Sequence, residues 1–477
     1  MRISIFLIAL LNLNINAGAD DAISYHCHYG KPGDNSVQIN LKLPEKSQGP
    51  LTFIMPRAIP MGYANVQYDR FIENLEPFSD KGDSLKVERQ EGPRWKIGQA
   101  GETVSRIEYK IDIARMEKEI HSAADASKLR AGYAGLLGYS IFGYVEGLEE
   151  KPLRLQIDAP DGWPVFTTLS PRAPPAVRTA SAEAPNFYAL ADSQIMMGPD
   201  LRVRRFESAV PLYAVVYAET EIEIEVLGRI ASDALSKVVA YFGSAPFPHY
   251  TIHQEYLRPV SASHEYGFSM EHLNSGTFFM GVDRALTARA SPDVQRGVFL
   301  NFVHHMAHSW IPKRSYGEGY FPFNWELAPV IDTIWLSEGF IRYVSIEITG
   351  EQLADPDAYR KSVLDSFRRY VKESPAFIRK MSLAELSRTG STVYSEDFRI
   401  GRNLFMRGAL MAADIDERIR EQTKGKKRFR DLLRYLTAWS ASERRAFRTE
   451  ELPAIFKKAA GVDVEAVIRE WLRPAEQ

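Results

Sequence analysis

Residues 303–308 read Val303-His304-His305-Met306-Ala307-His308, and Glu338 follows in the segment Trp335-Leu336-Ser337-Glu338-Gly339-Phe340. On a helix, residues four apart lie about 40° apart around the axis and about 6 Å apart along it. His304 and His308 can therefore aim two imidazoles at one point. Two histidines and a carboxylate are a ligand set for zinc that leaves a fourth position open. The stretch predicts a metal-binding domain built on two helices.

The predicted histidine helix has two different faces. Gly297 and Asn301 share the stripe of His304 and His308, whereas the opposite side is bulky and apolar, with Phe299, Phe302, Val303, Met306 and Trp310. Core histidines would lie among the apolar residues, so this pattern favours a metal site. An isolated pair of histidines four apart also occurs at surfaces and in cores, and spacing alone leaves that alternative open.

The whole-chain composition is that of an ordinary globular protein. The chain has 477 residues, 45% of them hydrophobic and 25% charged, with a formal net charge of -2. This length allows two or three domains. The near-neutral charge gives no reason to expect nucleic acid as a partner.

The N-terminus has the pattern of a secretory signal. Met1-Arg2 is positive, residues 3–15 are mostly apolar, and Ala17-Gly18-Ala19 fits a cleavage site after Ala19. The apolar stretch is too short for a comfortable membrane span, and no second run of about twenty apolar residues follows. The single cysteine, Cys27, excludes an internal disulfide. We expect a soluble exported protein, periplasmic or extracellular, without a membrane span.

The hydrophobic period changes along the chain. Residues 20–225 mostly alternate between apolar and polar positions, which predicts an antiparallel β domain. The run Glu221–Val226 alternates throughout and reads as its last strand. Residues 226–477 follow a helical period, so we predict the α+β class with a helical second domain.

Two helix boundaries are marked by local signals. Residues 230–242 should form a helix that ends at Gly243. Ser291-Pro292-Asp293 combines a capping hydroxyl, a proline at the first position and an acid in the first turn. The helix that begins there should pass through the histidines to Ile311 and stop at Pro312.

Several motifs together resemble the glycyl aminopeptidase family (M61) of metallopeptidases. The family's histidine helix is matched by His304, His308, Trp310 and Lys313-Arg314, and its aromatic Glu-Gly-Phe segment by Trp335-x-x-Glu338-Gly339-Phe340. Its Gly-Leu-Glu-His segment resembles Ser269-Met270-Glu271-His272, and its Lys-Gly helix resembles the segment with Arg407-Gly408. Matches in the N-terminal half include Gly62-Tyr63, so the resemblance covers nearly the whole chain after the signal segment.

The resemblance implies a fold and a set of roles. An antiparallel β domain would precede a thermolysin-like (gluzincin), mainly helical catalytic domain. Many family members end in a PDZ domain, but only about fifty residues follow Thr423, too few for one, so we expect no PDZ domain here. His304, His308 and Glu338 would bind one zinc ion. Glu271 would hold a free N-terminal amine in catalysis, and Glu271 and His272 would line the substrate site. A packed cleft or core histidine is the alternative for His272.

His305 departs from the family pattern. The family carries a catalytic glutamate there, which takes a proton from the attacking water and passes it to the leaving amine. Histidine can transfer protons near neutral pH, but its reach differs and a nearby dication opposes its protonation. Three alternatives follow: His305 is an unusual base, it is a further metal ligand in a structural site, or the activity is lost.

Phe405 is a second departure. It stands in Leu404-Phe405-Met406, where the family helix has tyrosines, one of which could support an oxyanion. Phenylalanine donates no hydrogen bond, and losing one such donor costs about 10²–10³ in rate. Tyr394 is a possible replacement donor; a packed loop aromatic is the alternative.

The sequence predicts a zinc metallopeptidase homologue that cleaves peptide bonds near a free N-terminus with metal-activated water. The alternative is a catalytically impaired pseudopeptidase that acts as a peptide-binding or zinc-stabilised scaffold. In either case the partner is a peptide. The peptide preference and the oligomeric state do not follow from the sequence.

Overall fold

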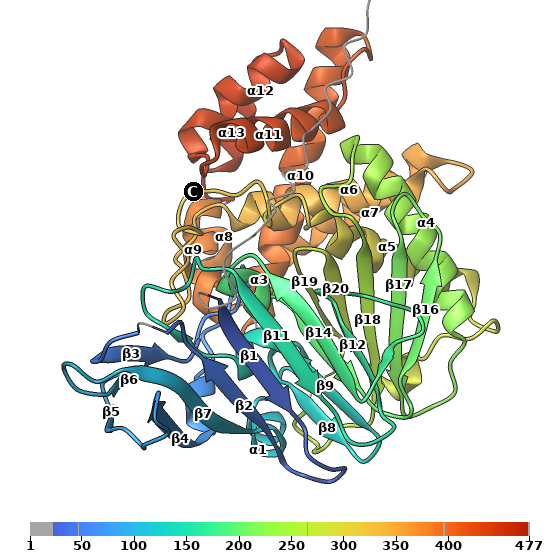
Figure 1. The fold of residues 1–477 in the computed structure, drawn as a ribbon. Coiled ribbons are helices and arrows are strands. Elements are labelled where there is room, and N and C mark those ends of the chain that lie inside the picture. Colours follow the sequence, from blue (N-terminus) through green and yellow to red (C-terminus); the bar gives the residue numbers. More distant parts are fainter. Residues whose placement is uncertain (1–21, 46, 265, 395, 476–477) are drawn as a thin grey trace, which may run out of the picture.

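The computed structural model describes residues 22–475 except 46, 265 and 395. The predicted signal segment, residues 1–19, lies outside the described residues. Within them the predicted α+β class is confirmed: an antiparallel-rich β region comes first and a helical region follows (Figure 1).

A six-stranded sheet organises the N-terminal region. Its strands alternate between buried and partly exposed positions, as the period of two predicts. Only β1 and β11 pair in parallel; the other neighbours are antiparallel. The order is β14-β11-β1-β2-β7-β4, with β1 Ile23–His28, β2 Ser36–Lys42, β4 Ile72–Ser79, β7 Val104–Asp112, β11 Leu153–Asp158 and β14 Thr179–Ala184.

Two smaller sheets complete this region. One has the order β10-β3-β6-β5, with β3 Leu51–Ile54, β5 Val87–Arg89, β6 Arg94–Ile97 and β10 Tyr144–Val145. The other has the order β13-β12-β15-β9-β8, with β8 Lys128–Arg130, β9 Tyr133–Leu137, β12 Pro164–Thr167, β13 Ala176–Val177 and β15 Gln194–Met197. Short helical segments connect the strands: η1 Tyr68–Phe71, α1 Ile113–Glu119, η2 Ala123–Asp125, α2 Gly138–Ile141 and α3 Phe187–Ala191.

A five-stranded sheet crosses the boundary that we expect near residue 225. Its order is β16-β17-β18-β20-β19, with β16 Arg202–Phe206, β17 Leu212–Ala218, β18 Tyr250–Leu257, β19 Phe268–Glu271 and β20 Ser275–Gly281. All eight residues of β18 are buried, because the sheet is covered on both faces. Helix α4, Ile224–Phe242, separates β17 from β18, and their pairing is parallel. The short segment η3, Val282–Arg284, follows β20.

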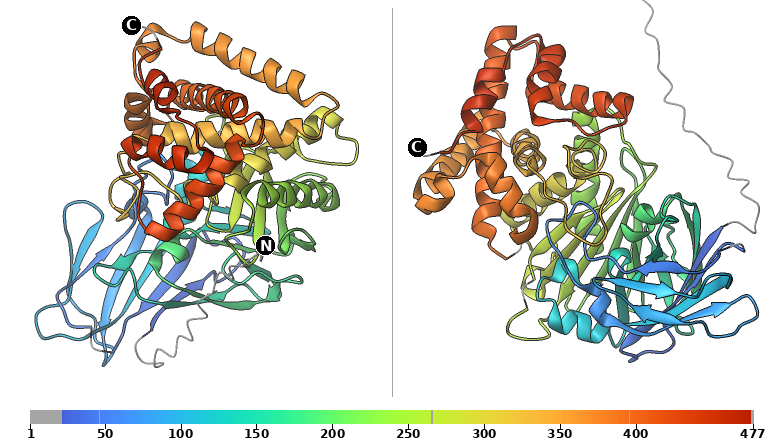
Figure 2. Two further views of the ribbon diagram at one scale, coloured as in Figure 1. Left: turned by 90° about the horizontal axis from the view of Figure 1, so that it is seen from above. Right: turned by 90° about the vertical axis from the view of Figure 1, so that its left-hand side faces the viewer.

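Helices dominate the rest of the described chain, at the end of the molecule away from the N-terminal strands (Figures 1 and 2). None of the helices in the described residues is both long and apolar enough to cross a membrane. The helical segments are α5 Pro292–Ala307, η4 Trp335–Phe340, α6 Ile341–Gly350, α7 Pro356–Glu373, α8 Ala376–Arg379, α9 Leu383–Val393, α10 Phe398–Thr423, α11 Phe429–Glu443, η5 Thr449–Glu451, α12 Leu452–Ala460 and α13 Glu465–Trp471.

The helix signals predicted one helix start and one helix end correctly. Ser291 caps α5 through a bond from the Val294 N–H, and Gly243 ends α4 in the left-handed conformation, as predicted. The prediction that α5 continues to Ile311 is wrong. It ends at Ala307, where the backbone changes to tighter turns: the N–H groups of Ser309 and Trp310 donate to the carbonyls of Met306 and Ala307.

The strand predicted over Glu221–Val226 is also wrong. Helix α4 begins at Ile224, six residues before the start that the period suggests. The side chain of Glu223 accepts a hydrogen bond from the Ala288 N–H, and its backbone N–H donates to the carbonyl of Leu286. These bonds favour the start of a helix at this segment over pairing with a neighbouring strand.

Candidate metal centre

Helix α5 presents His304 at its last turn and His308 as its C-cap residue. Its opposite side packs into the core, where Phe299, Phe302, Val303 and Met306 are buried, as the two-faced pattern predicts. The burial of this apolar side fixes the rotation of the helix. As a result His304 and His308 lie on the side that faces Glu338.

Glu338 lies in η4, a π-helical turn that leads directly into α6. Such turns insert an extra residue into a helix and are common at functional sites. Its side chain is buried beside both histidines.

Two glycines let η4 approach α10 closely. A Cβ atom on Gly339 would overlap the backbone of Gly408, and one on Gly408 would overlap the carbonyl of Trp335. The two helices therefore touch backbone to backbone immediately after Glu338. This contact fixes the carboxylate relative to the residues that α10 contributes to the site.

Three donor atoms converge at the centre. The Nε2 atoms of His304 and His308 are 3.1 Å apart, and each lies 3.4 Å from Oε2 of Glu338. Zinc bonds of about 2.0–2.1 Å to tetrahedral ligands separate those ligands by about 3.3–3.4 Å. The three separations fit that geometry closely. In the described residues, these three side chains form one of two groups with metal-ligand spacing.

The protonation of the histidines also fits a cation site. The Nδ1 atom of His308 faces the Ile311 carbonyl at 2.9 Å, so it carries the proton there and leaves the Nε2 electron pair directed at the centre. Without a metal, a proton on His308 supplies the positive charge beside Glu338 and Glu271. Burial opposes the charge on His308, but Glu271 and Glu338 outweigh it and raise its pKa to about 9. Burial and neighbouring His308 lower the pKa of His304 to about 3.

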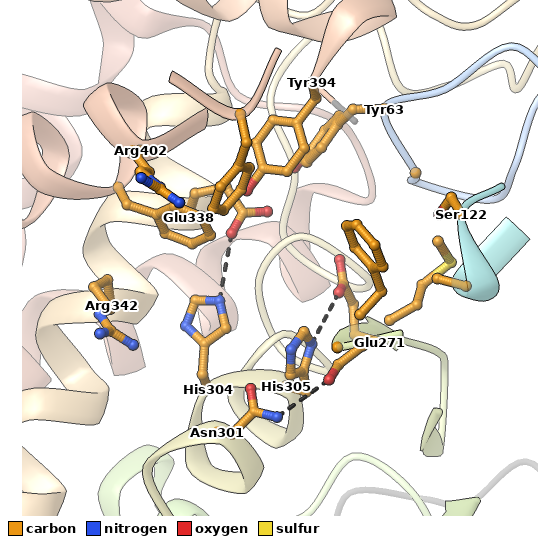
Figure 3. Close-up of a pocket in the computed structure, with 18 of the residues that line it drawn as sticks. Tyr63, Ser122, Glu271, Asn301, His304, His305, Glu338, Arg342, Tyr394 and Arg402 are labelled. Carbon is orange, nitrogen blue, oxygen red and sulfur yellow. Dashed lines mark hydrogen bonds and ion pairs between the residues drawn. The ribbon is translucent and has the colours of Figure 1, made fainter. Parts of the chain in front are cut away.

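His305 and Glu271 form a second pair beside the centre. Their Nδ1 and Oε2 atoms are 3.4 Å apart, an ion-pair distance at which the geometry makes no hydrogen bond (Figure 3). Burial opposes ionisation of Glu271, but His308 and His305 outweigh it and hold its pKa well below the usual range. In the described residues, His305 is not part of the group with metal-ligand spacing.

A cavity of about 400 Å³ opens onto these groups. His304, His305, Glu271 and Glu338 all line it, so the structure brings four predicted site residues together. Tyr394 lines it too, with its ring 6.1 Å from that of Phe405. Phe405 lies against His304, with ring centroids 5.4 Å apart.

His272 lies apart from this cavity. Its ring contacts Asp192 through Nδ1 at 3.0 Å and Thr277 through Nε2 at 3.2 Å, and it does not line the cavity. The structure therefore does not bring His272 together with the other predicted site residues. Its position beside a buried carboxylate agrees with the alternative of a packed histidine.

Lys313 is buried with the same carboxylate. Its Nζ atom lies 3.0 Å from Oδ1 of Asp192 and donates to the Pro60 carbonyl at 2.8 Å. Asp192 also accepts from the Leu273 N–H at 2.6 Å. A carboxylate from the N-terminal region thus holds the end of the segment that carries Glu271.

Tyr63 is a site residue that sequence reasoning missed. It comes from the loop after β3, lines the cavity, and its hydroxyl lies 3.0 Å from Ser337 Oγ, next to Glu338. The same hydroxyl lies 3.0 Å from that of Tyr320. The motif Gly62-Tyr63 was visible only as part of the family resemblance, and its role depends on a contact across 274 positions.

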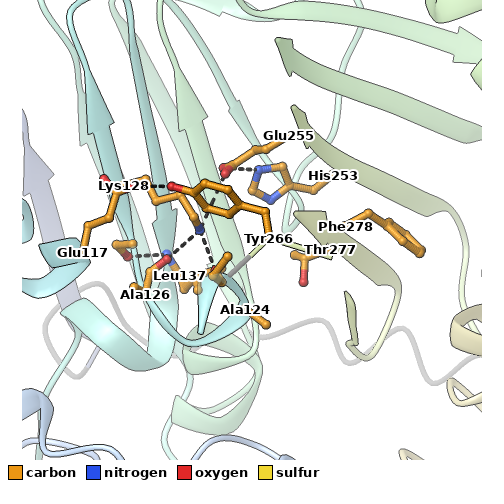
Figure 4. A network of polar contacts seen from close by, with 12 residues as sticks. Glu117, Ala124, Ala126, Lys128, Leu137, His253, Glu255, Tyr266, Thr277 and Phe278 are labelled. Carbon is orange, nitrogen blue, oxygen red and sulfur yellow. Dashed lines mark hydrogen bonds and ion pairs between the residues drawn. The ribbon is translucent and has the colours of Figure 1, made fainter. Parts of the chain in front are cut away.

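A buried lysine holds η2, the short helical segment that lines part of the cavity. Lys128 Nζ donates to the carbonyls of Ala123 and Ala126 at 2.7 and 2.8 Å and lies 3.5 Å from Glu255 (Figure 4). These bonds hold η2, from which Ala124 and Asp125 line the cavity. Burial lowers the pKa of Lys128, and the charge of Glu255 opposes that shift.

The N-terminal region matches a known domain family. Residues 24–199 match the model of the Peptidase M61 N-terminal domain. None of the curated proteins matches the chain in sequence.

Solved structures share the fold over nearly the whole chain. An aminopeptidase N family protein from Idiomarina loihiensis superposes with a TM-score of 0.83 at 18% identity, over 95% of this chain and 76% of that one. An M1 zinc metallopeptidase from Deinococcus radiodurans, in a variant bound to a Tyr-Ser-Ala substrate, gives 0.55 at 14% identity, over 96% and 94%. The chain has an M1/M61-like metallopeptidase fold. The chain therefore shares its fold with these metallopeptidases, and its N-terminal region matches the Peptidase M61 N-terminal domain.

Proposed function

We propose that the chain binds one zinc ion and hydrolyses peptide bonds near a free N-terminus, as an aminopeptidase does. The convergence of His304, His308 and Glu338 within 3.1–3.4 Å of one another carries the proposal. The same cavity contains Glu271 and His305, an acid and an imidazole that peptide hydrolysis can use. Zinc at these ligands would polarise the scissile carbonyl and lower the pKa of water.

Glu271 and His305 divide the remaining tasks. The buried carboxylate of Glu271 attracts the free amine of a peptide and so selects substrates with an unblocked N-terminus. His305 accepts a proton at its ring, and Glu271 stabilises the resulting imidazolium from 3.4 Å. The negative charge of Glu271 offsets the repulsion that a nearby dication exerts on a protonated imidazole.

A second candidate is a pseudopeptidase that binds peptides without cleaving them efficiently. Two observations favour it. Histidine replaces glutamate at position 305, and Phe405, which cannot donate a hydrogen bond, lies against His304. In this alternative the metal stabilises the fold and the cavity binds peptide.

Metal analysis combined with a peptidase assay tests the proposal. We expect about one zinc per chain by mass spectrometry, lost in His304→Ala and kept in His121→Ala, because His121 is exposed outside the cavity. Purified protein that holds no zinc and cannot be reconstituted contradicts the metal site. Cleavage of short peptides with free, but not acetylated, N-termini supports the aminopeptidase. Zinc binding without cleavage supports the pseudopeptidase.

We also propose that the protein is exported, on the pattern of residues 1–19. Sequencing the N-terminus of the protein purified from the periplasm or medium should start at Asp20. A cytoplasmic protein that retains Met1 contradicts export.

A further inference from the structure

Two arginines in the cavity lack acidic partners. Arg342 and Arg402 both line the cavity, and none of the carboxylates in the described residues lies within salt-bridge range of either. By contrast Arg399, one turn before Arg402 on α10, pairs with Asp397 at 2.6 Å. Burial lowers the pKa of Arg342, so its charge carries a desolvation cost that an anion would offset.

The helices place both arginines next to the metal centre. Arg342 follows Glu338 by four positions, so it lies on the same side of the η4–α6 segment. Arg402 lies one turn before Phe405 on α10. Their guanidinium carbons lie over aromatic rings, 6.0 Å from the centroid of Phe367 and 5.3 Å from that of Phe398. These contacts favour defined positions for both groups.

The cavity is therefore divided by charge. We call Arg342 and Arg402 the basic wall, and Glu271 and Asp125 the acidic wall. Figure 3 shows Arg342 and Arg402 on the side of His304 away from Glu271, with Ser122 beyond Glu271. All four charged residues line the same cavity, and Figure 3 shows His304 and Glu338 between the two arginines and Glu271.

This arrangement matches a peptide that is positive at one end and negative at the other. Resting on the proposed function, we propose that the basic wall binds a carboxylate on the residue that follows the scissile bond. Guanidinium groups bind carboxylates through paired, charge-assisted hydrogen bonds. The ammonium group of lysine does not form such paired bonds as readily. The carboxylate has two possible sources, an Asp or Glu side chain or the C-terminus of a dipeptide.

Binding of non-cleavable peptides tests the subsite without requiring catalysis. Ketomethylene analogues of Ala-Gln-amide, Ala-Glu-amide and Ala-Gln with a free C-terminus are titrated into the zinc-loaded protein by calorimetry. We expect at least one of the two carboxylate analogues to bind about tenfold more tightly than the neutral one. The tighter of the two identifies the source of the carboxylate.

Matched variants assign the preference to the basic wall. Arg402→Gln, at an exposed position that tolerates change, should remove most of the preference, as should Arg342→Gln if circular dichroism shows it folded. Arg342→Lys should keep part of it, and Arg399→Gln should keep all of it.

The outcomes separate this subsite from the proposed function. Equal affinities for the three analogues, or a preference that survives in Arg402→Gln and Arg342→Gln, overturn the subsite alone. If the zinc-loaded protein binds none of the three analogues, peptide binding itself fails, and with it both proposals.

Discussion

The Nδ1 atom of His305 lies 3.4 Å from the Oε2 atom of Glu271, so the residue in the position of a catalytic base is paired with the residue that we assign to the substrate amine. One carboxylate thus serves two positive groups. A bound amine competes with a protonated His305 for the same charge. This competition is a physical reason to expect slow turnover even with zinc bound.

Replacing His305 with glutamate should therefore raise activity. We expect His305→Glu to increase kcat/KM on short peptides about 100-fold, because a carboxylate restores the family's general base and removes the competing cation. The comparison is made at equal zinc content, with His305→Gln as a neutral control that should show no gain. A fast wild type that is slowed by His305→Glu would refute the idea that His305 limits the rate.

Phe405→Tyr tests the missing hydrogen-bond donor. Its ring lies 5.4 Å from the ring of His304, so a hydroxyl on it would project within the cavity. In the His305→Glu background we expect a further gain of about tenfold or more in kcat, since an oxyanion donor is worth up to about 10²–10³. Phe398→Tyr is the control, because Phe398 lines the same cavity from the same helix and is 40% exposed. Equal effects of the two changes would show that the hydroxyl has no specific role at position 405.

Lys313→Met should destabilise the protein strongly. Lys313 and Asp192 are a buried pair, with side chains 0% and 2% exposed, and removing the lysine leaves the buried carboxylate without its positive counter-charge, which costs about 3–5 kcal/mol. Urea denaturation followed by tryptophan fluorescence measures the free energy of unfolding. Arg154→Met, which breaks an exposed contact with Glu183, should cost about 0–1 kcal/mol. Similar losses for the two variants would contradict the structural role of the buried pair.

Asp125 should make stability depend on pH. Burial raises its pKa to about 6, although Ser122 and Lys128 oppose the shift. The folded pKa lies above the unfolded value of about 3.9, so the unfolded state ionises first and stability falls as the pH rises from about 4 to 6. Asp125→Asn removes this loss. Its stability relative to wild type should rise by about 2–3 kcal/mol between pH 4 and pH 7.

Urea titrations at both pH values measure this difference. Because Asp125 is only 4% exposed, solvent screens the effect little. A difference between variant and wild type that stays constant with pH would show that Asp125 titrates normally.

The features that the sequence predicted correctly depend on interactions between residues close together in the chain. The Ser291 cap and the spacing of His304 and His308 depend on neighbours within a turn, and the structure has both the helix start and the convergent imidazoles. The end of α5 depends on a change to tighter backbone turns after Ala307, which the hydrophobic period does not register.

Contacts between residues far apart in the chain could not be predicted from the sequence. The charged pair Lys313–Asp192 joins residues 121 positions apart, and an isolated basic residue gives no sign of such a partner. Tyr63 reaches the centre from a loop whose position depends on the packing of the whole N-terminal region. The apolar alternation at Glu221–Val226 suits a strand as well as a helix start, and tertiary bonds to Glu223 decided between them.

The contact between Gly339 and Gly408 limits how the shape of the cavity can change during evolution. It leaves no room for even a methyl group between the helix that holds Glu338 and the helix that carries Arg402 and Phe405. A shift of α10 that reshaped the cavity would also move the carboxylate of Glu338. Changes of peptide preference can therefore arise by exchanging side chains on a fixed backbone, but not by sliding one helix along the other.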